Sequence, residues 1–462
     1  MDEPKQLHIA VFPWLAFGHL IPNLKLSILI AQRGHKISFI STPRNIQRLP
    51  KIPPHLALNI NLVSFPLPHV EHLPPDAEAT SDLPTGKIPY LKTAFDGLED
   101  SLAQFLQSFS PDWIISDFAP YWLPSIAANL KIPFAHFSIF NAWSLTFIRP
   151  GSIKDQRIKA EDFTVPPKWV PFPSKVAFRL HEAKKFLTHF EGNASGVSDI
   201  QRVVAILENC VVIAVRSCME LEGDYLNLLG ELYEKPAVPV GILPPSADED
   251  GENNDNEGWL TIKEWLDKQN KGTVVYVAFG SELTLTQDEL TELAMGLELS
   301  GLPFFWVMRK ISNSVEGVPL ELPEEFEERN KGRGVVWTSW APQVRIIGHE
   351  SVGGFLTHCG FSSVSEALAF GRPLIMLPFG LDLGLVARAI GEKGVGIEVP
   401  REENDGSYTR KSLAESLRLV VTDIKGETYR AKAKEMEKLF SDKELNGRYI
   451  DQFIEVLQNH RQ

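Results

Sequence analysis

The sequence is poor in cysteine, in long apolar runs and in positive charge. Its 462 residues include only 3 cysteines, and they show no paired spacing of the kind that forms a disulfide framework or a zinc site. This usage is typical of a reducing compartment, and we expect a cytoplasmic location. No apolar window approaches the roughly 18 residues that a membrane-spanning helix needs, so we expect no membrane insertion.

The deficit in positive charge excludes another class of function. Lys and Arg number 46 against 59 Asp and Glu, which gives a formal net charge of −13. Such a chain lacks the basic field on which nucleic-acid binding depends, so we expect no nucleic-acid partner. A small anionic ligand in a local pocket is still compatible with this charge. The N-terminus also lacks the basic start and the cleavage site of a signal peptide.

Short β-branched apolar runs are abundant, and each precedes a longer helical pattern. Continuous apolarity is typical of strands covered on both faces of a parallel sheet. The pattern occurs twice, so we predict an α/β protein of two doubly wound domains. The predicted strands lie within residues 7–14, 36–42, 113–117, 134–140, 211–217, 273–281, 304–309, 334–340, 352–358 and 373–379.

An acidic stretch, SADEDGENNDNEG at residues 246–258, separates the two sets of strands. It has almost no apolar side chains and cannot contribute to a core, so we interpret it as a linker. We therefore predict an N-terminal domain over 1–245 and a C-terminal domain over 259–440. Residues 426–460 show the apolar stripe of two closing helices. The helix within 441–462 is predicted to pack back on the N-terminal domain.

Polar residues follow several of the predicted strands. His19 comes after the first strand, Asp117 after the strand at 113–116, and Ser281 after the strand at 273–280. In open parallel sheets, ligands bind at the carboxyl ends of the strands. Two such sheets facing each other would form a cleft with catalytic groups on one wall and a nucleotide on the other.

The segment THCGFSSVSEALAFG, at 357–371, joins a strand end to a helix start. A helix N-terminus offers unpaired N–H groups and about half a positive charge, which suits a phosphate. Gly360 permits close backbone approach, Ser362 and Ser363 add hydroxyl groups, and His358 can donate a ring N–H. We therefore expect a diphosphate here. The intervening cysteine is interpreted as a packed residue, and we predict no metal.

Two side chains near this segment have alternative interpretations. Glu366 forms a capping box with Ser363, which the spacing alone favours, or it accepts hydrogen bonds from a ribose diol. Trp340 precedes a proline-fixed turn and either stacks on a base or packs at an interface. In the first case Gln343 would bond the base edge or the ribose. Spacing does not decide between the two roles of the tryptophan.

The block from Trp340 to Leu383 resembles the signature of plant family-1 UDP-dependent glycosyltransferases. The resemblance covers essentially the whole chain, and FPWLAFGHLIPNLKLS at 12–27 is similar to the family's N-terminal catalytic segment. It implies the GT-B fold, in which two Rossmann-like parallel-sheet domains face a central cleft. It also implies an inverting transfer from a UDP-sugar, which is a co-substrate, without a further cofactor. Segments 37–50, 63–80 and 112–128 resemble the subgroup that extends the sugar of flavonoid or terpenoid glycosides.

The resemblance also implies roles for single residues. Trp340 would stack on uracil, while Gln343 and Glu366 would hold the ribose. His358 and Ser363 would bind the diphosphate. The residues expected to contact the UDP-sugar are Ser281, Trp340, Ala341, Gln343, His358, Gly360, Ser362, Ser363, Glu366, Asp382 and Leu383.

Three positions depart from the usual family pattern. Phe361 stands where Trp is usual, Ser362 where Asn is usual, and Leu383 where Gln is usual. That Gln commonly bonds the hydroxyls of glucose, and losing a hydrogen bond to a buried hydroxyl costs about 1–3 kcal/mol. An apolar Leu383 would instead suit the 6-deoxy carbon of rhamnose. Because Asp382 remains to bond the sugar, we predict UDP-glucose as the first donor and UDP-rhamnose as the second.

Sugar transfer needs a group that takes the proton of the acceptor hydroxyl. A positioned imidazole does so with a gain of roughly 10²–10⁴-fold. The residues alone favour His19 as a surface histidine and Asp117 as a cap. The family resemblance at both positions reverses this order: His19 becomes the base, and Asp117 orients its ring.

Aromatic residues cluster after strands of the first domain, and two interpretations of them are equally open. Phe118, Tyr121, Trp122, Phe140 and Trp143 either line an apolar slot for a flat acceptor or pack between domains. The residues that we expect to contact the acceptor are Phe118, Trp122, Phe140 and Phe379.

Two rival functions fit parts of the pattern. A catalytically impaired protein that binds a nucleotide sugar or another small ligand would keep the fold, but the retention of His19 and Asp117 argues against it. A dinucleotide oxidoreductase also has parallel α/β domains, yet the first strand is followed by LAFGHLIP rather than by a glycine-rich fingerprint. We expect a monomeric enzyme whose partners are a UDP-sugar and a small-molecule glycoside.

Overall fold

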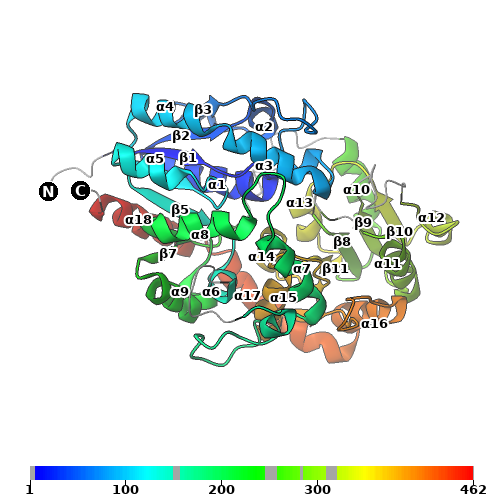
Figure 1. The fold of residues 1–462 in the computed structure, drawn as a ribbon. Helices are drawn as coiled ribbons and strands as arrows, with labels where there is room; N and C mark the ends of the chain where they lie inside the picture. Colours follow the sequence, from blue (N-terminus) through cyan, green and yellow to red (C-terminus); the bar gives the residue numbers. More distant parts are fainter. Residues whose placement is uncertain are drawn as a thin grey trace. The chain divides into compact units, whose positions relative to one another are not determined.

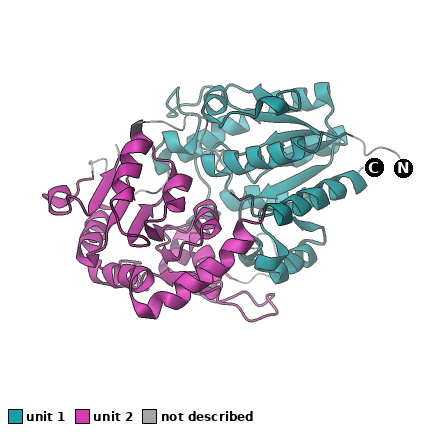
Figure 2. Ribbon diagram, turned by 180° about the vertical axis from the view of Figure 1, so that it is seen from behind, with its two compact units in different colours: residues 1–156, 187–243, 443–462 teal, residues 157–186, 244–442 magenta. Residues whose placement is uncertain are grey.

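The structure is a computed structural model that describes residues 6–148, 157–244, 257–280, 283, 285–308 and 320–460. The chain divides into two compact units (Figure 2). Unit 1 consists of residues 1–156, 187–243 and 443–462, and unit 2 consists of residues 157–186 and 244–442.

Within the described residues, unit 1 contains a seven-stranded parallel sheet in the order β3-β2-β1-β4-β5-β6-β7 (Figure 1). Its strands are β1 His8–Phe12, β2 Lys36–Ser41, β3 Ile60–Ser64, β4 Trp113–Ser116, β5 Phe134–Ser138, β6 Val212–Val215 and β7 Ala237–Pro239. Its helices are α1 Phe17–Ala31, α2 Pro43–Arg48, α3 Ile88–Asp96, α4 Glu99–Phe109, α5 Leu123–Leu130, α6 Ala142–Ile148, α8 Asp199–Asn209, α9 Met219–Tyr233 and α18 Lys443–Asn459.

The continuous apolarity of the strands has a direct structural cause. Successive side chains of a strand point to opposite faces, and in unit 1 helices cover both faces. In β1, Ala10 and Phe12 belong to one buried cluster, while Ile9 and Val11 belong to the cluster on the other face. Residues that point to either face of the sheet must therefore be apolar. The alternation of a half-exposed strand is absent from β1 for this reason.

Unit 2 contains, among the described residues, a six-stranded parallel sheet in the order β10-β9-β8-β11-β12-β13. Its strands are β8 Val274–Ala278, β9 Phe304–Val307, β10 Gly334–Trp337, β11 Val352–Thr357, β12 Leu374–Met376 and β13 Gly396–Glu398. Its helices, with α7 at the unit boundary, are α7 Leu180–Leu187, α10 Glu257–Asp267, α11 Gln287–Ser300, α12 Phe326–Arg329, α13 Gln343–Gly348, α14 Phe361–Ala369, α15 Leu383–Glu392, α16 Arg410–Val421 and α17 Glu427–Phe440.

All ten predicted strands occur, and α17 and α18 confirm the two closing helices. Three strands were not predicted: β3, β7 and β13. Each lies at the edge of its sheet, where only one neighbouring strand is present. Two of them have only three residues, and β3 has an interrupted pattern, INLVS, with exposed positions. A continuous apolar run is not required there.

The division into units differs from the predicted domains at residues 157–186, which belong to unit 2. Ion pairs explain this placement. Arg388 on α15 donates to Glu182 on α7 at 2.5 Å, and Arg179 donates to Glu398 at 2.8 Å. The predicted boundary at residue 245 and the linker as far as residue 256 lie outside the described residues.

Helix α18 belongs to unit 1, where its red ribbon lies among blue and cyan elements (Figure 1). Ile450, Phe453 and Leu457 are fully buried in the cluster that also contains strand β1 residues. The indole N–H of Trp113 on β4 donates to the carbonyl oxygen of Leu457 at 2.9 Å. The end of the chain therefore completes the core of the first sheet.

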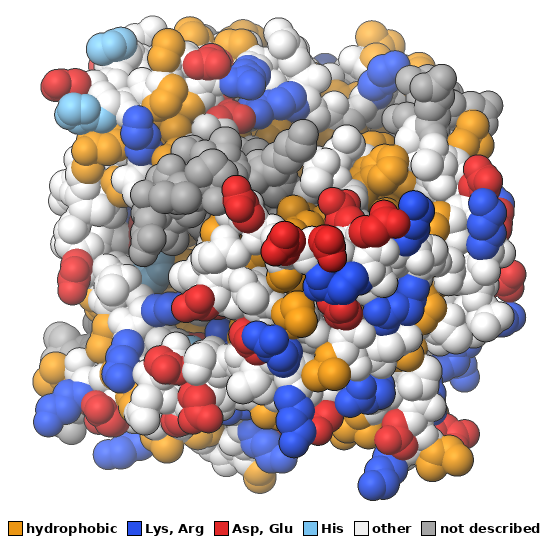
Figure 3. All heavy atoms as spheres, turned by 90° about the vertical axis from the view of Figure 1, so that its right-hand side faces the viewer, with side chains coloured by type: hydrophobic (Ala, Val, Ile, Leu, Met, Phe, Trp, Pro, Cys, Tyr) orange, Lys and Arg blue, Asp and Glu red, His pale blue; other side chains and the backbone are white. Residues whose placement is uncertain are grey.

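Surface charge agrees with the composition. On the face shown in Figure 3, acidic and basic side chains are interspersed, and Lys and Arg form no continuous stripe among the described residues of that face. In the described part of the chain, no helix has both the length and the apolarity to cross a bilayer.

Candidate functional site

The carboxyl ends of β1 and β4 carry the first group of site residues. In unit 1 the strand order reverses between these two neighbours, and in unit 2 it reverses between β8 and β11. At such a switch point the flanking crossovers leave in opposite directions, and ligands of open α/β sheets bind there. His19 and Asp117 follow the first pair of strands, and Gly280 and His358 follow the second.

His19 and Asp117 form a hydrogen-bonded pair. The distance from His19 Nδ1 to Asp117 Oδ2 is 2.9 Å, and the aspartate is 1% exposed. The backbone N–H of Trp14 donates to the same oxygen at 2.7 Å, so the carboxylate is held from β1 as well. Because a carboxylate accepts, Nδ1 carries the proton and Nε2 has a free lone pair. This is the arrangement of an oriented base.

The ring of His19 has aromatic neighbours. The centroid of Phe118 lies 5.5 Å and that of Phe140 lies 6.2 Å from the imidazole centroid. Trp122, by contrast, is buried against the stacked rings of Phe12 and Phe95 in the core of unit 1. Of the three predicted acceptor residues in this unit, two therefore adjoin His19 and the third is a core side chain.

His136 on β5 pairs in the sheet with Ser116, the residue before Asp117, and was not predicted as a site residue. It is buried, and its desolvation lowers its pKa to about 4, although the nearby Asp117 charge acts in the opposite direction. The side chain is therefore neutral near neutral pH. A histidine within the otherwise apolar run FAHFS was the available sequence signal.

In unit 2, the segment after β11 makes a sharp strand-to-helix turn. Cys359 has φ 74°, in the left-handed region that few residues other than glycine adopt. Gly360 is the N-cap of α14 and has no side chain that could cap the first turn. Ser362 and Ser363 lie in this first turn and are partly exposed. The positive end of a helix dipole beside two hydroxyl groups suits an anion, and the diphosphate site stays a prediction.

Two glycines lie close to the His358 ring at this turn. A Cβ on Gly280 would lie 3.0 Å from His358 Nε2, and a Cβ on Gly360 would lie 2.9 Å from the same atom. Burial lowers the pKa of His358 to about 4, so the imidazole is neutral near neutral pH. Its Nδ1 is buried without a hydrogen-bond partner among the described residues. A phosphate oxygen would remove the cost of an unpaired ring N–H.

Gln343 and Glu366 form one polar network with a buried tyrosine. Gln343 Nε2 donates to Glu366 Oε2 at 2.7 Å and to Ser363 Oγ at 3.1 Å. The hydroxyl of Tyr276 on β8 donates to Gln343 Oε1 at 3.2 Å. Tyr276 thereby fixes which end of the amide faces Glu366. Sequence reasoning missed this tyrosine, whose only signal is a hydroxyl within the apolar strand VVYVA.

The capping-box interpretation of Glu366 is wrong. Ser363 is the third residue of α14, not its N-cap, because the helix already begins at Phe361. Glu366 consequently lies in the second turn, too far along the helix to reach the N-cap amide. Its side chain instead accepts from Gln343.

The remaining predicted residues of unit 2 lie in varied surroundings. Trp340 is 64% exposed, and its neighbour Ala341 is partly exposed. Asp382 is the buried N-cap of α15, and Leu383 begins that helix with partial exposure. Phe379 packs against Phe279 and Tyr408, with centroid distances of 5.8 and 6.4 Å. Ser281 lies outside the described residues.

Cys359 is not poised as a nucleophile. The thiol is buried, and desolvation raises its pKa well above the ordinary value. A buried neutral thiol neither ionises nor reaches a substrate readily. This agrees with the prediction of a packed residue.

Comparisons with known proteins identify the family. The family model of UDP-glucoronosyl and UDP-glucosyl transferases matches residues 238–452. UDP-glycosyltransferase 91D2 of Stevia rebaudiana is 49% identical, over 100% of this chain and 96% of its own length. UDP-glycosyltransferase 91A1 of Arabidopsis thaliana is 48% identical, over 99% of this chain and 97% of its own length.

The chain belongs to the UDP-glycosyltransferase family. This UDP-glycosyltransferase is thus an enzyme that uses a UDP-sugar donor and a small-molecule acceptor, as predicted. A further relative, the soyasaponin III rhamnosyltransferase of Glycine max, is 44% identical over 100% of the enzyme and 97% of its own length.

Solved structures show the same fold. Glycyrrhiza uralensis UGT73P12, complexed with glycyrrhetinic acid 3-O-monoglucuronide, superposes with a TM-score of 0.78 at 21% identity, over 98% of the enzyme and 96% of that chain. Arabidopsis thaliana UGT89C1, complexed with UDP-L-rhamnose, superposes with a TM-score of 0.73 at 24% identity, over 98% of the enzyme and 100% of that chain. The prediction of two Rossmann-like parallel-sheet domains of the GT-B type is confirmed.

Proposed function

We propose that the enzyme transfers a sugar, with inversion, from a UDP-sugar to a hydroxyl of a terpenoid or flavonoid glycoside. The observation that carries this proposal is the hydrogen-bonded pair of His19 and Asp117 at 2.9 Å. Its bond to the carboxylate leaves His19 Nε2 available to take the proton of an acceptor hydroxyl. Asp117 keeps the imidazole in that tautomer and stabilises the imidazolium that forms. The reaction needs no covalent intermediate with the protein.

The departing diphosphate needs stabilisation, which unit 2 offers. We assign this role to the first turn of α14, where the positive end of the helix dipole and the hydroxyls of Ser362 and Ser363 lie. His358 would act as a neutral N–H donor, since burial lowers its pKa to about 4. Fixed donors in a desolvated site stabilise developing negative charge more strongly than water does. We assign the uridine to Trp340, Gln343 and Glu366. The side-chain amide of Gln343 already donates a hydrogen bond to the carboxylate of Glu366.

For the donor sugar, we propose glucose first and rhamnose second. Asp382, at the N-cap of α15, supports a donor rich in hydroxyl groups. Leu383, the first residue of that helix, supports rhamnose, because its side chain cannot bond a hydroxyl at the sixth carbon. A relative that is 44% identical is named a soyasaponin III rhamnosyltransferase, which supports the second donor and a saponin-type acceptor.

Replacement of His19 by Ala tests the mechanism. We expect kcat to fall about 10²–10⁴-fold, the usual contribution of a positioned base. The affinity for UDP, measured by calorimetry, should be unchanged because the uridine residues belong to unit 2. Wild-type turnover by the His19→Ala variant would contradict the assignment. Failure of the wild-type enzyme to release UDP with any donor and acceptor would favour the binding-protein alternative.

The donor and the acceptor can be tested together. UDP-glucose and UDP-rhamnose should each be offered with matched pairs of a glycoside and its aglycone, and the added mass measured. We expect a hexose to be added to the glycosides and little product from the aglycones. Addition of a deoxyhexose would overturn the donor choice, and equal use of aglycones would overturn the acceptor class.

A further inference from the structure

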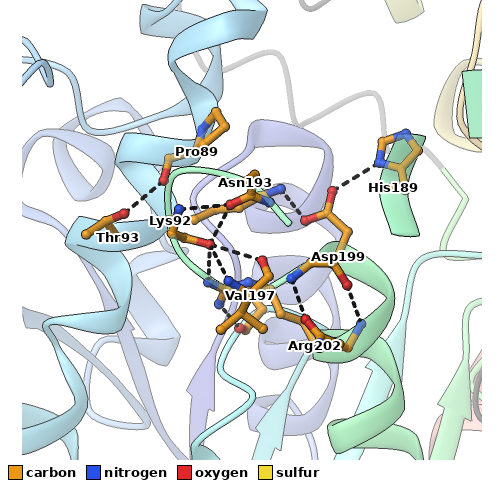
Figure 4. A network of polar contacts seen from close by, with 12 residues as sticks. Pro89, Lys92, Thr93, His189, Asn193, Val197, Asp199 and Arg202 are labelled. Atoms are coloured by element: carbon orange, nitrogen blue, oxygen red, sulfur yellow. Dashed lines mark hydrogen bonds and ion pairs between the residues drawn. The ribbon is translucent and has the colours of Figure 1, made fainter. Parts of the chain in front are cut away.

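Two ion pairs, each with a buried cation and a partly buried carboxylate, join α3 to α8 in unit 1. Figure 4 labels Lys92, Asp199 and Arg202 of these pairs. Lys92 contacts Asp199, and Asp96 contacts Arg202. The two α3 residues are four positions apart and the two α8 residues are three apart, so the pairs lie one helical turn from each other. They are similar in chemistry and burial but differ in what else they bind.

The Asp96–Arg202 pair extends to the loop after β4. Arg202 Nη1 donates to Asp96 Oδ1 and to the carbonyl oxygen of Ala119, both at 2.7 Å. Its Nη2 donates to Asp96 Oδ2 at 2.5 Å and to Ser195 Oγ at 3.1 Å. The side chain is 0% exposed, and its guanidinium carbon lies 5.0 Å from the centroid of Tyr121. Both terminal nitrogens of the guanidinium are thus engaged, whereas the buried Nε has no hydrogen-bond partner among the described residues.

Ala119 links this guanidinium to the proposed catalytic pair. Its N–H donates to Asp117 Oδ1 at 3.3 Å, while its carbonyl accepts from Arg202. The residue is therefore held at both ends, between the carboxylate that orients His19 and the buried arginine. Phe118, the residue between them, lies against the His19 ring. A shift of the Ala119 carbonyl would move both Asp117 and Phe118.

The Lys92–Asp199 pair provides a natural comparison. Burial opposes ionisation of Asp199, but His189 and Lys92 together lower its pKa to about 2, so this carboxylate is ionised near neutral pH. His189 Nδ1 donates to Asp199 Oδ2 at 3.1 Å. In the described part of the chain, these contacts join α3 to α8 and its preceding segment without involving residues 117–122.

We propose that Arg202, held by Asp96, is a positioning residue for sugar transfer. It fixes the Ala119 carbonyl and thereby the orientation of Asp117 and Phe118 toward His19. The proposal rests on the proposed function, since it acts through the assigned base. Arg202 does not touch the substrate, so its replacement should lower kcat and leave KM unchanged.

The test is Arg202→Lys, with Lys92→Met as the matched control. Lysine keeps an ion pair with Asp96 but cannot also bond the Ala119 carbonyl with the geometry of a guanidinium. We expect Arg202→Lys to lower kcat about tenfold or more at unchanged KM for the UDP-sugar, since one charge-assisted hydrogen bond is lost. Lys92→Met should lower the melting temperature by at least as much as Arg202→Lys does. It should leave kcat within about twofold of the wild-type value. Equal kcat values for the two variants would overturn the proposal.

A double-mutant cycle separates this inference from the proposed function. If Arg202 acts through His19, Arg202→Lys should cause no further loss in the His19→Ala background. An equal loss in both backgrounds would refute the positioning role while leaving His19 as the base. Full activity of His19→Ala alone would instead refute the proposed function. If Arg202→Lys does not fold, Asp96→Asn, which loosens the same guanidinium, should lower kcat in the same direction, and an unchanged kcat would overturn the proposal.

Discussion

Replacement of Gly360 by Ala should displace His358 without straining the backbone. Gly360 has φ −57°, which any residue adopts, so the substitution adds only a methyl group. That methyl carbon would lie 2.9 Å from His358 Nε2 and 3.1 Å from Cε1. Ordinary contacts of this kind are at least about 3.4 Å, so the ring has to move by about 0.5 Å. Gly280 also lies close to the ring, since a Cβ there would come within 3.0 Å of Nε2 and Cε1.

The expected cost follows from the hydrogen bond that we assign to His358. A donor–acceptor distance near 2.9 Å, lengthened by about 0.5 Å, leaves the normal range of hydrogen bonds. Hydrogen bonds to charged groups contribute about 1.5–3 kcal/mol. The dissociation constant for UDP should therefore rise about tenfold or more. Because Ala is a poorer N-cap than Gly, α14 should also lose up to about 1 kcal/mol of stability.

Isothermal titration of UDP into the two proteins measures this effect, with thermal unfolding as a check on the fold. Gly380→Ala is the matched control, since a Cβ at Gly380 meets nothing within 4 Å. It should bind UDP as the wild type does. Unchanged UDP affinity in Gly360→Ala, at a normal melting temperature, would refute the assignment of His358 to the diphosphate.

Two further predictions concern buried hydroxyl and imidazole groups. Tyr276→Phe leaves Gln343 Oε1 without its donor, so the dissociation constant for UDP should rise about fivefold, equivalent to about 1 kcal/mol. Tyr408→Phe, which removes a buried hydroxyl bonded to Glu289, should leave that constant unchanged in the same calorimetric assay; equal effects would contradict the role of Tyr276. His136 has a folded pKa of about 4 against 6.5 unfolded, so its contribution to stability is full above 6.5 and is lost as the pH falls toward 4. At about pH 5 the free energy of unfolding should be about 2 kcal/mol lower for this reason. Urea unfolding should show that the His136→Gln variant loses about 2 kcal/mol less than the wild type between neutral pH and pH 5. An equal loss in both proteins would contradict the depressed pKa.

Sequence patterns predicted the parts of the fold that depend on local apolarity. A central strand such as β1 needs apolar side chains on both faces, and this leaves a run that can be recognised without knowledge of its neighbours. His19 and Asp117 could then be placed at strand ends. Their hydrogen bond follows because β1 and β4 are adjacent, which the switch-point topology of the sheet provides.

Residues whose role depends on a distant partner escaped prediction. Arg202 and Ala119 are 83 positions apart, and Tyr276 and Gln343 are 67 apart. Nothing in the local sequence of α8 or β8 indicates that such a partner exists. Glu366 shows the opposite error: a local spacing that matches a capping box was overruled by the turn at Cys359, which starts the helix earlier. Local rules fail where tertiary contacts set the geometry.

The two histidines at the two switch points show that surroundings, not topology, decide the chemistry. Each follows a central strand of a parallel sheet. His19 adjoins the carboxylate of Asp117, which can stabilise a proton on the ring. Burial alone lowers the pKa of His358, whose ring lies close to two glycines. The first ring is therefore suited to accept a proton and the second to remain neutral and donate a hydrogen bond. One residue type beside the switch point of each sheet thus serves both halves of the proposed transfer: His19 takes the acceptor's proton, and His358 holds the leaving diphosphate.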